Sequence, residues 1–510
     1  MDDNGSGAFM IPAHSGTGFH VKMVGVMRSP DNLPHATRAS TLIMTVDPEI
    51  QRAVANAKPA TFCYSRYIVK AILFHLYFVP TTIVLLPFYI LLACLPFLGR
   101  KYHNWTVVEA VGVFVTQRAM RNLIRFRMQP LPPREKGWRE MDNALGGSLS
   151  LLNLSGPGGL VSSIRPVVNQ VAQYTREGRR DSDWFDPPPL EYLKGILTIK
   201  VGNNQVTDSK DYQGPALVEP KWAKTRVKGF WFMHNHTHSP IPGPSGSQKR
   251  SVLLYFHGGA GVTFAAGDVF MGQTLCKSIS SQVQVDIFSV DYHLSPFSCF
   301  PVPILQALAG YVHLIHNYGY HPSQIMIGGD SFGAWMALEL ENYLRTDGHD
   351  IVKNWSHKAP TVSGVPRLLL LSPWVCAYDI ETESRSQDGL ARFDILRLDY
   401  GDWGLDAMQV GPKYKDRCPA PLTNPWLSPI SFSQADMRQM PPSFVCLGSV
   451  EALHDEDSQF VKQLQKSGAD VKLYVDIGAV HDYGTMSTFS QRFKKTLTAV
   501  KQWMNASLAE

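Results

Sequence analysis

The feature that most constrains the fold of this chain is a serine between two glycines, in the order Gly329-Asp330-Ser331-Phe332-Gly333. An apolar run over residues 324–327 precedes it and predicts a buried strand, and residues 334–343 follow with a helix-forming pattern. Glycines on both sides relieve the crowding at a sharp turn from strand to helix that exposes a serine hydroxyl. Because the helix dipole also favours negative charge at a helix N-terminus, we predict that Ser331 is a nucleophile.

A glycine-rich segment earlier in the chain complements this serine. Residues 251–256 are apolar and predict a buried strand, which continues directly into His257-Gly258-Gly259-Ala260-Gly261. Glycine permits positive φ and a close approach of the backbone to a ligand. The N–H groups of such a loop can stabilise an oxyanion, although a glycine-rich turn on its own also occurs in ordinary tight loops.

A serine hydroxyl is a weak nucleophile at neutral pH, and it needs a base and an acid that orients the base. With this kind of turn, the expected chain order is serine, acid, histidine. Glu451 is the first carboxylate after a predicted turn and strand at 441–448, and His481 follows a predicted strand at 472–475. Sites on α/β sheets gather beyond the C-terminal ends of the strands. We therefore predict Glu451 as the acid and His481 as the base.

Other residues near these positions offer alternatives. Asp455 and Asp457 follow Glu451 closely, and their other role is charge at a helix N-terminus or on a solvated surface. His454 is the rival of His481 as base, but its place beside the acid favours a surface residue. The choice between Glu451 and Asp455 stays open at this point.

From about residue 196, short apolar strands alternate with helix-like stretches. This alternation predicts an α/β fold with a mostly parallel sheet flanked by helices. We assign residues 196–510 to this catalytic domain. The length of 510 residues exceeds one average domain, which agrees with one large domain plus appendages.

Residues 71–99 contain no Asp, Glu, Lys or Arg. About 20 such residues suffice to cross a bilayer. Pro80, Pro87 and Pro96 favour a kinked or shallow insertion, and a buried core helix or an interfacial segment is the alternative. We predict a membrane anchor at 66–101 that crosses once, after a mobile polar arm at 1–65. Basic residues nearly balance across its flanks, which leaves the orientation open.

Two further patterns bear on the membrane. Residues 105–127 predict a helix with several arginines near its end, which fits an anionic lipid surface and a solvated helix face equally well. Sequons for glycosylation matter only if the C-terminal part is lumenal, and they also arise by chance. The sequons lie at Asn104, Asn153, Asn235, Asn354 and Asn505.

Composition argues against several other classes of function. The charged fraction is 18%, below the usual quarter, and the net charge of +5 accompanies no nucleic-acid-binding motif. The 7 cysteines are scattered without a CxxC pair. This argues against a zinc site or a dense disulfide framework and leaves room for one or two disulfides. We expect no metal and no cofactor.

Together, these motifs resemble the hormone-sensitive-lipase-like group of α/β-hydrolases, which includes arylacetamide deacetylase and fungal steryl acetyl hydrolases. The resemblance covers roughly residues 250–505. It is carried by His257-Gly258-Gly259, Asp291-Tyr292-x-Leu294-x-Pro296, Gly329-Asp330-Ser331-x-Gly333, Ser372-Pro373-Trp374, Ser428-Pro429 and the regions of Glu451 and His481.

The resemblance implies Ser331 as nucleophile, His481 as base and the Glu451 position as acid, where the family more often has Asp. It implies an oxyanion hole built from the amides of Gly258, Gly259, Ala260 and Phe332. The family usually has glycine at the position of Ala260 and a small residue at that of Phe332. Both residues keep their amide donors, but we expect the Phe332 ring to crowd the acyl side and favour short acyl groups.

The resemblance also implies a lid, formed by an insertion at 376–436 and by part of the region 102–195. With the predicted anchor, it implies a single-pass serine ester hydrolase in the endoplasmic reticulum membrane. Its substrates would be acetyl or other short-acyl esters of hydrophobic alcohols such as sterols, and its partners would include membrane lipid but no nucleic acid. The alternatives are an amidase or acyltransferase with the same residues, a non-catalytic ligand-binding protein on a hydrolase scaffold, and a membrane scaffold protein.

Overall fold

The computed structural model describes most of the chain beyond residue 45. The described residues are 46–60, 64–95, 102–130, 182–202, 216–234, 251–353, 361–379, 382, 384, 385, 389–487 and 489–506. Most of the predicted arm at 1–65 lies outside them. Pro96 and the sequons at Asn153, Asn235 and Asn354 lie outside them as well.

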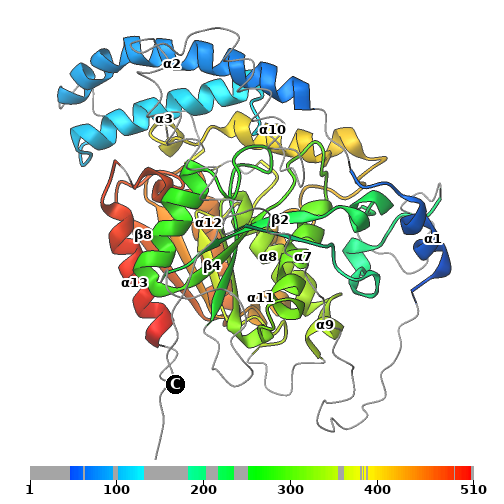
Figure 1. The fold of residues 1–510 in the computed structure, drawn as a ribbon. Coiled ribbons are helices and arrows are strands. Elements are labelled where there is room, and N and C mark those ends of the chain that lie inside the picture. The colour runs from blue at the N-terminus through cyan, green and yellow to red at the C-terminus, as the bar shows by residue number, and fades with distance from the viewer. Residues whose placement is uncertain are drawn as a thin grey trace, which may run out of the picture. The chain divides into compact units, whose positions relative to one another are not determined.

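A sheet of eight strands forms the centre of the described structure (Figure 1), in the order β1-β2-β4-β3-β5-β6-β7-β8. Neighbouring strands from β4 to β8 are parallel, whereas β1 and β2 at one edge are antiparallel. The strands are β1 (Ser182–Phe185), β2 (Val227–Phe232), β3 (Val252–Phe256), β4 (Asp286–Asp291), β5 (Ile325–Asp330), β6 (Leu368–Leu371), β7 (Ser443–Gly448) and β8 (Val471–Asp476). The prediction of a mostly parallel sheet flanked by helices is therefore confirmed.

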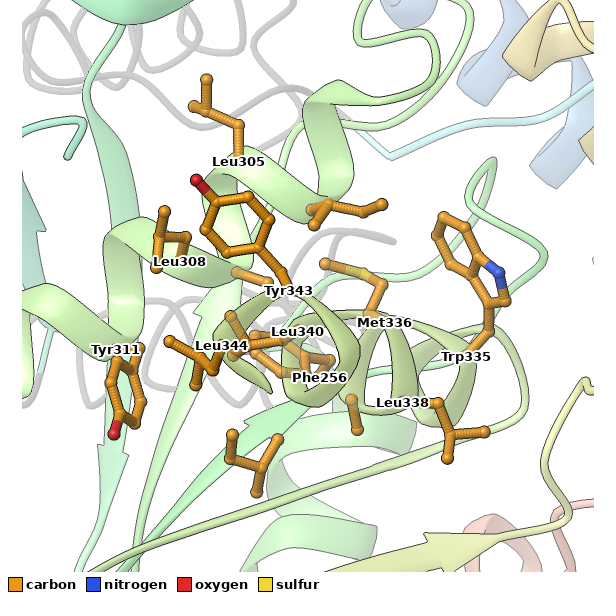
Figure 2. Packing of buried hydrophobic residues seen from close by; sticks show 14 of the residues in the cluster. Phe256, Leu305, Leu308, Tyr311, Trp335, Met336, Leu338, Leu340, Tyr343 and Leu344 are labelled. Carbon is orange, nitrogen blue, oxygen red and sulfur yellow. The ribbon is translucent and has the colours of Figure 1, made fainter. Parts of the chain in front are cut away.

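Helices cover both faces of this sheet, because its inner strands are apolar on both sides. Successive side chains of β3 alternate between the faces: Leu254 and Phe256 join the core beneath α7 and α8, and Leu253 and Tyr255 join the core beneath α13. Figure 2 shows the first of these cores. The helices are α1 (Pro48–Asn56), α2 (Tyr64–Cys94), α3 (Val107–Phe126), α6 (Lys277–Ile279, between π-helical turns Val269–Cys276 and Ser280–Gln284), α7 (Val302–His316), α8 (Phe332–Arg345), α9 (His349–Lys353), α10 (Leu398–Met408), α11 (Gln434–Arg438), α12 (His454–Ser467) and α13 (Arg492–Ala506).

Helix α2 contains most of the predicted membrane anchor and continues through Pro80 and Pro87. Its part from Val69 to Cys94 has 26 residues and a mean hydropathy of 2.0, and only 6% of its most apolar stretch is buried. The helix is therefore not a core helix, and by length and composition it can cross a membrane.

Helix α3 confirms the helix predicted at 105–127. Its N-terminus is a capping box, in which Thr106 and Glu109 each accept a hydrogen bond from the other's backbone N–H. Arg118 on α3 donates to the hydroxyls of Thr81 and Thr82 on α2. On its other side α3 contacts α10, which belongs to the long insertion between β6 and β7 (Figure 1). Helix α3 thus connects the apolar helix to the insertion.

Candidate active site

Ser331 occupies the turn between β5 and α8, with a φ of 52°. Residues other than glycine rarely adopt this conformation, and a serine held in it is typical of the sharp turn that exposes a nucleophile. A Cβ on Gly329 would lie 2.3 Å from the carbonyl carbon of Gly333, and a Cβ on Gly333 would lie 2.0 Å from the carbonyl oxygen of Phe256. The turn can form because both positions are glycine.

His481 faces this serine from the loop after β8. Its Nε2 lies 2.9 Å from the Oγ of Ser331. The ring is buried, and burial lowers the pKa of His481 to about 3. A ring that is neutral at pH 7 can accept the proton of the serine hydroxyl, as a general base must.

Glu451 lies on the other side of the histidine ring, beyond the end of β7. Its Oε2 is 3.8 Å from Nδ1 of His481, which is too long for a hydrogen bond, and it accepts a hydrogen bond of 2.7 Å from Ser372 Oγ. Within the described residues, neither Nδ1 of His481 nor Oε1 of Glu451 has a hydrogen-bond partner. A small movement would join the two groups, and catalytic hydrogen bonds often tighten only when substrate is bound.

Glu451 sits among other buried acidic groups. Burial and then the charge of Asp394 raise the pKa of Glu451 to about 8. Burial also raises the pKa of Asp457 and of Asp482 well above their usual range. The titratable groups around Glu451 are His481, Asp394, Cys446, Glu456, Asp457 and Asp482. Since these carboxyls repel one another when charged, the charge of Glu451 depends on the protonation of its neighbours.

The rivals named from the sequence have other partners. Asp455 accepts a hydrogen bond of 2.8 Å from the N–H of Ser384, and His454 lies 3.2 Å from the carbonyl oxygen of Gly448. Sequence reasoning overlooked Asp482, whose Oδ2 lies 3.3 Å from Nε2 of His481. It lies at the nitrogen that faces Ser331 rather than at Nδ1, so its position does not suit the orienting acid.

The glycine-rich loop passes beside Ser331 after β3. The N–H of Gly258 donates to Oδ2 of Asp330 at 2.9 Å. Because this donor is already bonded, Gly258 is not available to an oxyanion, contrary to the prediction. Gly259 and Ala260 both have positive φ, at 109° and 51°. In the part of the chain that the structure describes, the N–H groups of Gly259, Ala260 and Phe332 have no hydrogen-bond partner. These three amides remain available for an oxyanion.

Residues 253–485 match the protein-family model described as the alpha/beta hydrolase fold. This region has the α/β-hydrolase fold, and its motifs resemble those of the hormone-sensitive-lipase-like group. Its relatives include Lipase 2 of Moraxella sp. (strain TA144), with 26% identity over 48% of this chain and 57% of the lipase. An esterase of Acinetobacter venetianus is 26% identical over 50% of this chain and 75% of the esterase, and ethyl acetate hydrolase of Pseudomonas putida is 24% identical over 51% and 74%. The chain thus spans little more than half the length of the lipase.

Among solved structures, the hydrolase domain is similar to a thermostable carboxylesterase from a metagenomic library. The TM-score is 0.44 at 19% identity, over 55% of this chain and 84% of the carboxylesterase.

A cavity of about 250 Å³ opens at Ser331. The insertion of the hydrolase domain supplies most of its wall, including Leu396, Tyr400 and Leu405, and Trp374 and Ala260 line it nearer the serine. The expectation that Phe332 narrows this cavity is wrong. The Phe332 ring is fully buried and packs against Trp335 and Trp374 behind the cavity wall.

One further residue of the insertion reaches the site and was missed from the sequence. Asp394 is buried, and its carboxylate accepts hydrogen bonds from the backbone N–H groups of Ala452 at 2.7 Å, His481 at 2.8 Å and Ile395 at 2.7 Å. Burial raises the pKa of Asp394 to about 7. No motif surrounds it, and only a contact between distant segments reveals it.

The described residues contain no group of three or more His, Cys, Asp or Glu side chains arranged to hold a metal ion. The cysteines among them are free thiols, and all but Cys94 are buried.

Proposed function

We propose that this protein is a serine carboxylic-ester hydrolase with Ser331 as nucleophile, His481 as general base and Glu451 as the acid that orients the base. The observation that carries the proposal is the 2.9 Å distance between Ser331 Oγ and His481 Nε2, at a serine with a φ of 52°. The names of the relatives, a lipase, an esterase and an ethyl acetate hydrolase, support ester hydrolysis as the reaction type.

The reaction would proceed through an acyl-enzyme. Ser331 Oγ attacks the ester carbonyl carbon as its proton moves to His481 Nε2. The amides of Gly259, Ala260 and Phe332 stabilise the oxyanion of the tetrahedral intermediate. His481 then gives its proton to the departing alkoxide, and the acyl group stays on Ser331. A water molecule, deprotonated by His481, releases the acid and restores the hydroxyl.

The substrates that we propose are acetyl or other short-acyl esters of hydrophobic alcohols, with sterols as one such alcohol. A cavity of about 250 Å³ is small for a ligand pocket, which suits a short acyl group. The relative named ethyl acetate hydrolase fits the same acyl preference.

We also propose that α2 anchors the protein in a membrane, that of the endoplasmic reticulum. At about 1.5 Å per residue, a helix of this length exceeds the hydrocarbon thickness of about 30 Å, which supports a single crossing. In this proposal 66–101 is the anchor, and 102–195 adds to a lid, except that β1 (Ser182–Phe185) belongs to the central sheet and so extends the catalytic domain beyond the predicted 196–510. The insertion at 376–436 forms the rest of the lid.

The proposal is tested with p-nitrophenyl esters from acetate to long acyl chains, hydrolysed by the detergent-solubilised protein and by its Ser331→Ala variant. We expect turnover of the short esters, lost in the variant, and covalent labelling of Ser331 by an organophosphate. A folded protein that turns over no ester and is not labelled at Ser331 would instead favour a ligand-binding role. Activity confined to amides or to acyl transfer would replace the substrate class but keep the catalytic residues.

A further inference from the structure

The carboxylate of Asp394 joins the two loops that carry the acid and the base. Its Oδ1 accepts from the N–H of His481 at 2.8 Å, and its Oδ2 accepts from the N–H of Ala452 at 2.7 Å. Ala452 directly follows Glu451. Asp394 is only 2% exposed, and a buried carboxyl is costly unless hydrogen bonds compensate for lost water. A displacement of either loop would remove part of that compensation.

Helix α3 holds the segment of the insertion on which Asp394 lies. The side-chain amide of Gln117 donates to the carbonyl oxygen of Asp394 at 2.7 Å and to that of Phe393 at 3.2 Å. The Asp394 backbone is therefore fixed by a helix that precedes the whole sheet in the chain. Helix α3 therefore contacts the insertion, and the insertion contacts the loop after β8 that carries His481, here called the histidine loop.

The N-terminal end of α3 holds the same histidine loop at a second point. The indole N–H of Trp105, a side chain that is 2% exposed, donates to the carbonyl oxygen of Gly478 at 2.7 Å. Close by, Arg492 of α13 bonds the carboxylate of Glu109 at 2.9 Å and the carbonyl oxygen of Asn104 at 3.2 Å. The residues before His481 are thus tied to the start of α3.

We infer that Asp394 is a positioning residue for His481 and Glu451, and that Gln117 of α3 keeps it in place. The inference rests on the proposed roles of Ser331, His481 and Glu451. Neither α3 nor Gln117 belongs to residues 253–485, the part that matches the hydrolase family. The helix that follows the apolar α2 therefore takes part in setting the geometry of the catalytic base.

The test uses isosteric and truncating changes in the full-length, detergent-solubilised protein. Asp394→Asn keeps one acceptor oxygen but turns an NH₂ group toward a backbone N–H, and Gln117→Ala removes both hydrogen bonds to the insertion. The matched controls are Asp416→Asn, an exposed change in the same insertion, and Arg125→Gln, an exposed change on α3. The Asp394→Asn variant is expected to fold, because asparagine has nearly the same shape as aspartate.

Three measurements are compared with p-nitrophenyl acetate as substrate: kcat and KM, the rate at which an organophosphate labels Ser331, and hydrogen–deuterium exchange of segments 449–456 and 477–485. We expect Asp394→Asn to lower kcat and the labelling rate about 10- to 100-fold with KM nearly unchanged. Gln117→Ala should lower kcat about 3- to 10-fold. Both variants should exchange faster than the controls in the two segments.

The outcomes separate this inference from the proposed function. If the wild type hydrolyses the ester through Ser331 but Asp394→Asn keeps kcat and exchange at wild-type values, the positioning role is overturned. If the wild type neither hydrolyses esters nor is labelled at Ser331, the proposed function fails. In that case the exchange data alone decide whether Asp394 holds the two loops, and unchanged exchange rejects it.

Discussion

Replacing Arg385 by Met should destabilise the fold far more at pH 8 than at pH 5.5. Arg385 donates from Nε and Nη2 to the two carboxylate oxygens of Glu456, both at 2.6 Å, and the side chains are 14% and 0% exposed. Removing one partner of a buried ion pair leaves the other uncompensated, which costs about 3–5 kcal/mol. That cost applies only when Glu456 is charged.

The pH dependence follows from the pKa of Glu456. Burial raises this pKa from 4.5 to about 7, and the charge of Arg385 opposes the rise. Because the folded pKa is raised, the stabilising contribution of Glu456 is complete below the unfolded value and is lost as the pH rises through about 7. Without Arg385 the pKa rises further. At about pH 5.5 the carboxyl is protonated, and Arg385→Met should cost only about 1–2 kcal/mol in hydrogen bonds.

Urea unfolding followed by tryptophan fluorescence at the two pH values measures this difference. The double variant Arg385→Met/Glu456→Leu is the control, because replacing both members of a buried pair by apolar groups is often nearly neutral. Equal losses at the two pH values would refute the role of the Glu456 charge. A double variant as unstable as Arg385→Met would show that the loss comes from packing.

Three further outcomes are expected. Gly333→Ala should lower the free energy of unfolding on the order of 4 kcal/mol, because the added Cβ would overlap backbone atoms. Gly401→Ala in α10 should raise the free energy of unfolding by about 0.5–1 kcal/mol, because the nearest atom to the added Cβ is 3.9 Å away. Thermal unfolding of the two variants tests both values. In a pH profile, kcat/KM should rise through about pH 8 as Glu451 ionises. Asp394→Asn should move the midpoint of this rise to lower pH, because it removes a negative charge next to Glu451. An unmoved midpoint would contradict the assignment of the rise to Glu451. Ala260→Gly should leave kcat/KM within about threefold, because the amide donor remains, and a larger loss would mean that the methyl group itself contacts the substrate.

The local parts of the hydrolase fold could be predicted from the sequence because each has a signal within a few residues. The strand predicted at 251–256 contains β3, and the helix predicted at 334–343 lies inside α8. These segments are buried on both faces or flanked by glycines that a turn requires. The proximity of Ser331 and His481 followed from the same logic, since both lie at the carboxyl end of the sheet.

Contacts between distant segments could not be predicted in this way. Asp394 lies in an insertion without periodicity or motif, and Gln117 is one polar residue on a helix with several. The direction of the Phe332 ring was also mispredicted, because sequence gives the size of a side chain but not the space behind the turn into which it packs. Gly258 was mispredicted as an oxyanion donor for a similar reason. The motif does not show that its N–H already donates to Asp330.

The contacts of Trp105 and Gln117 with the histidine loop and the insertion determine where the chain can be shortened without disturbing the site. A version trimmed to the family boundaries at 253–485 would lose Trp105 and Gln117 together with the apolar helix. A shortened version should instead start near residue 102, so that the exposed apolar helix α2 is removed and α3 is kept. For the same reason, any other N-terminal segment that is joined to this domain must retain α3 or bring a helix that fits the insertion.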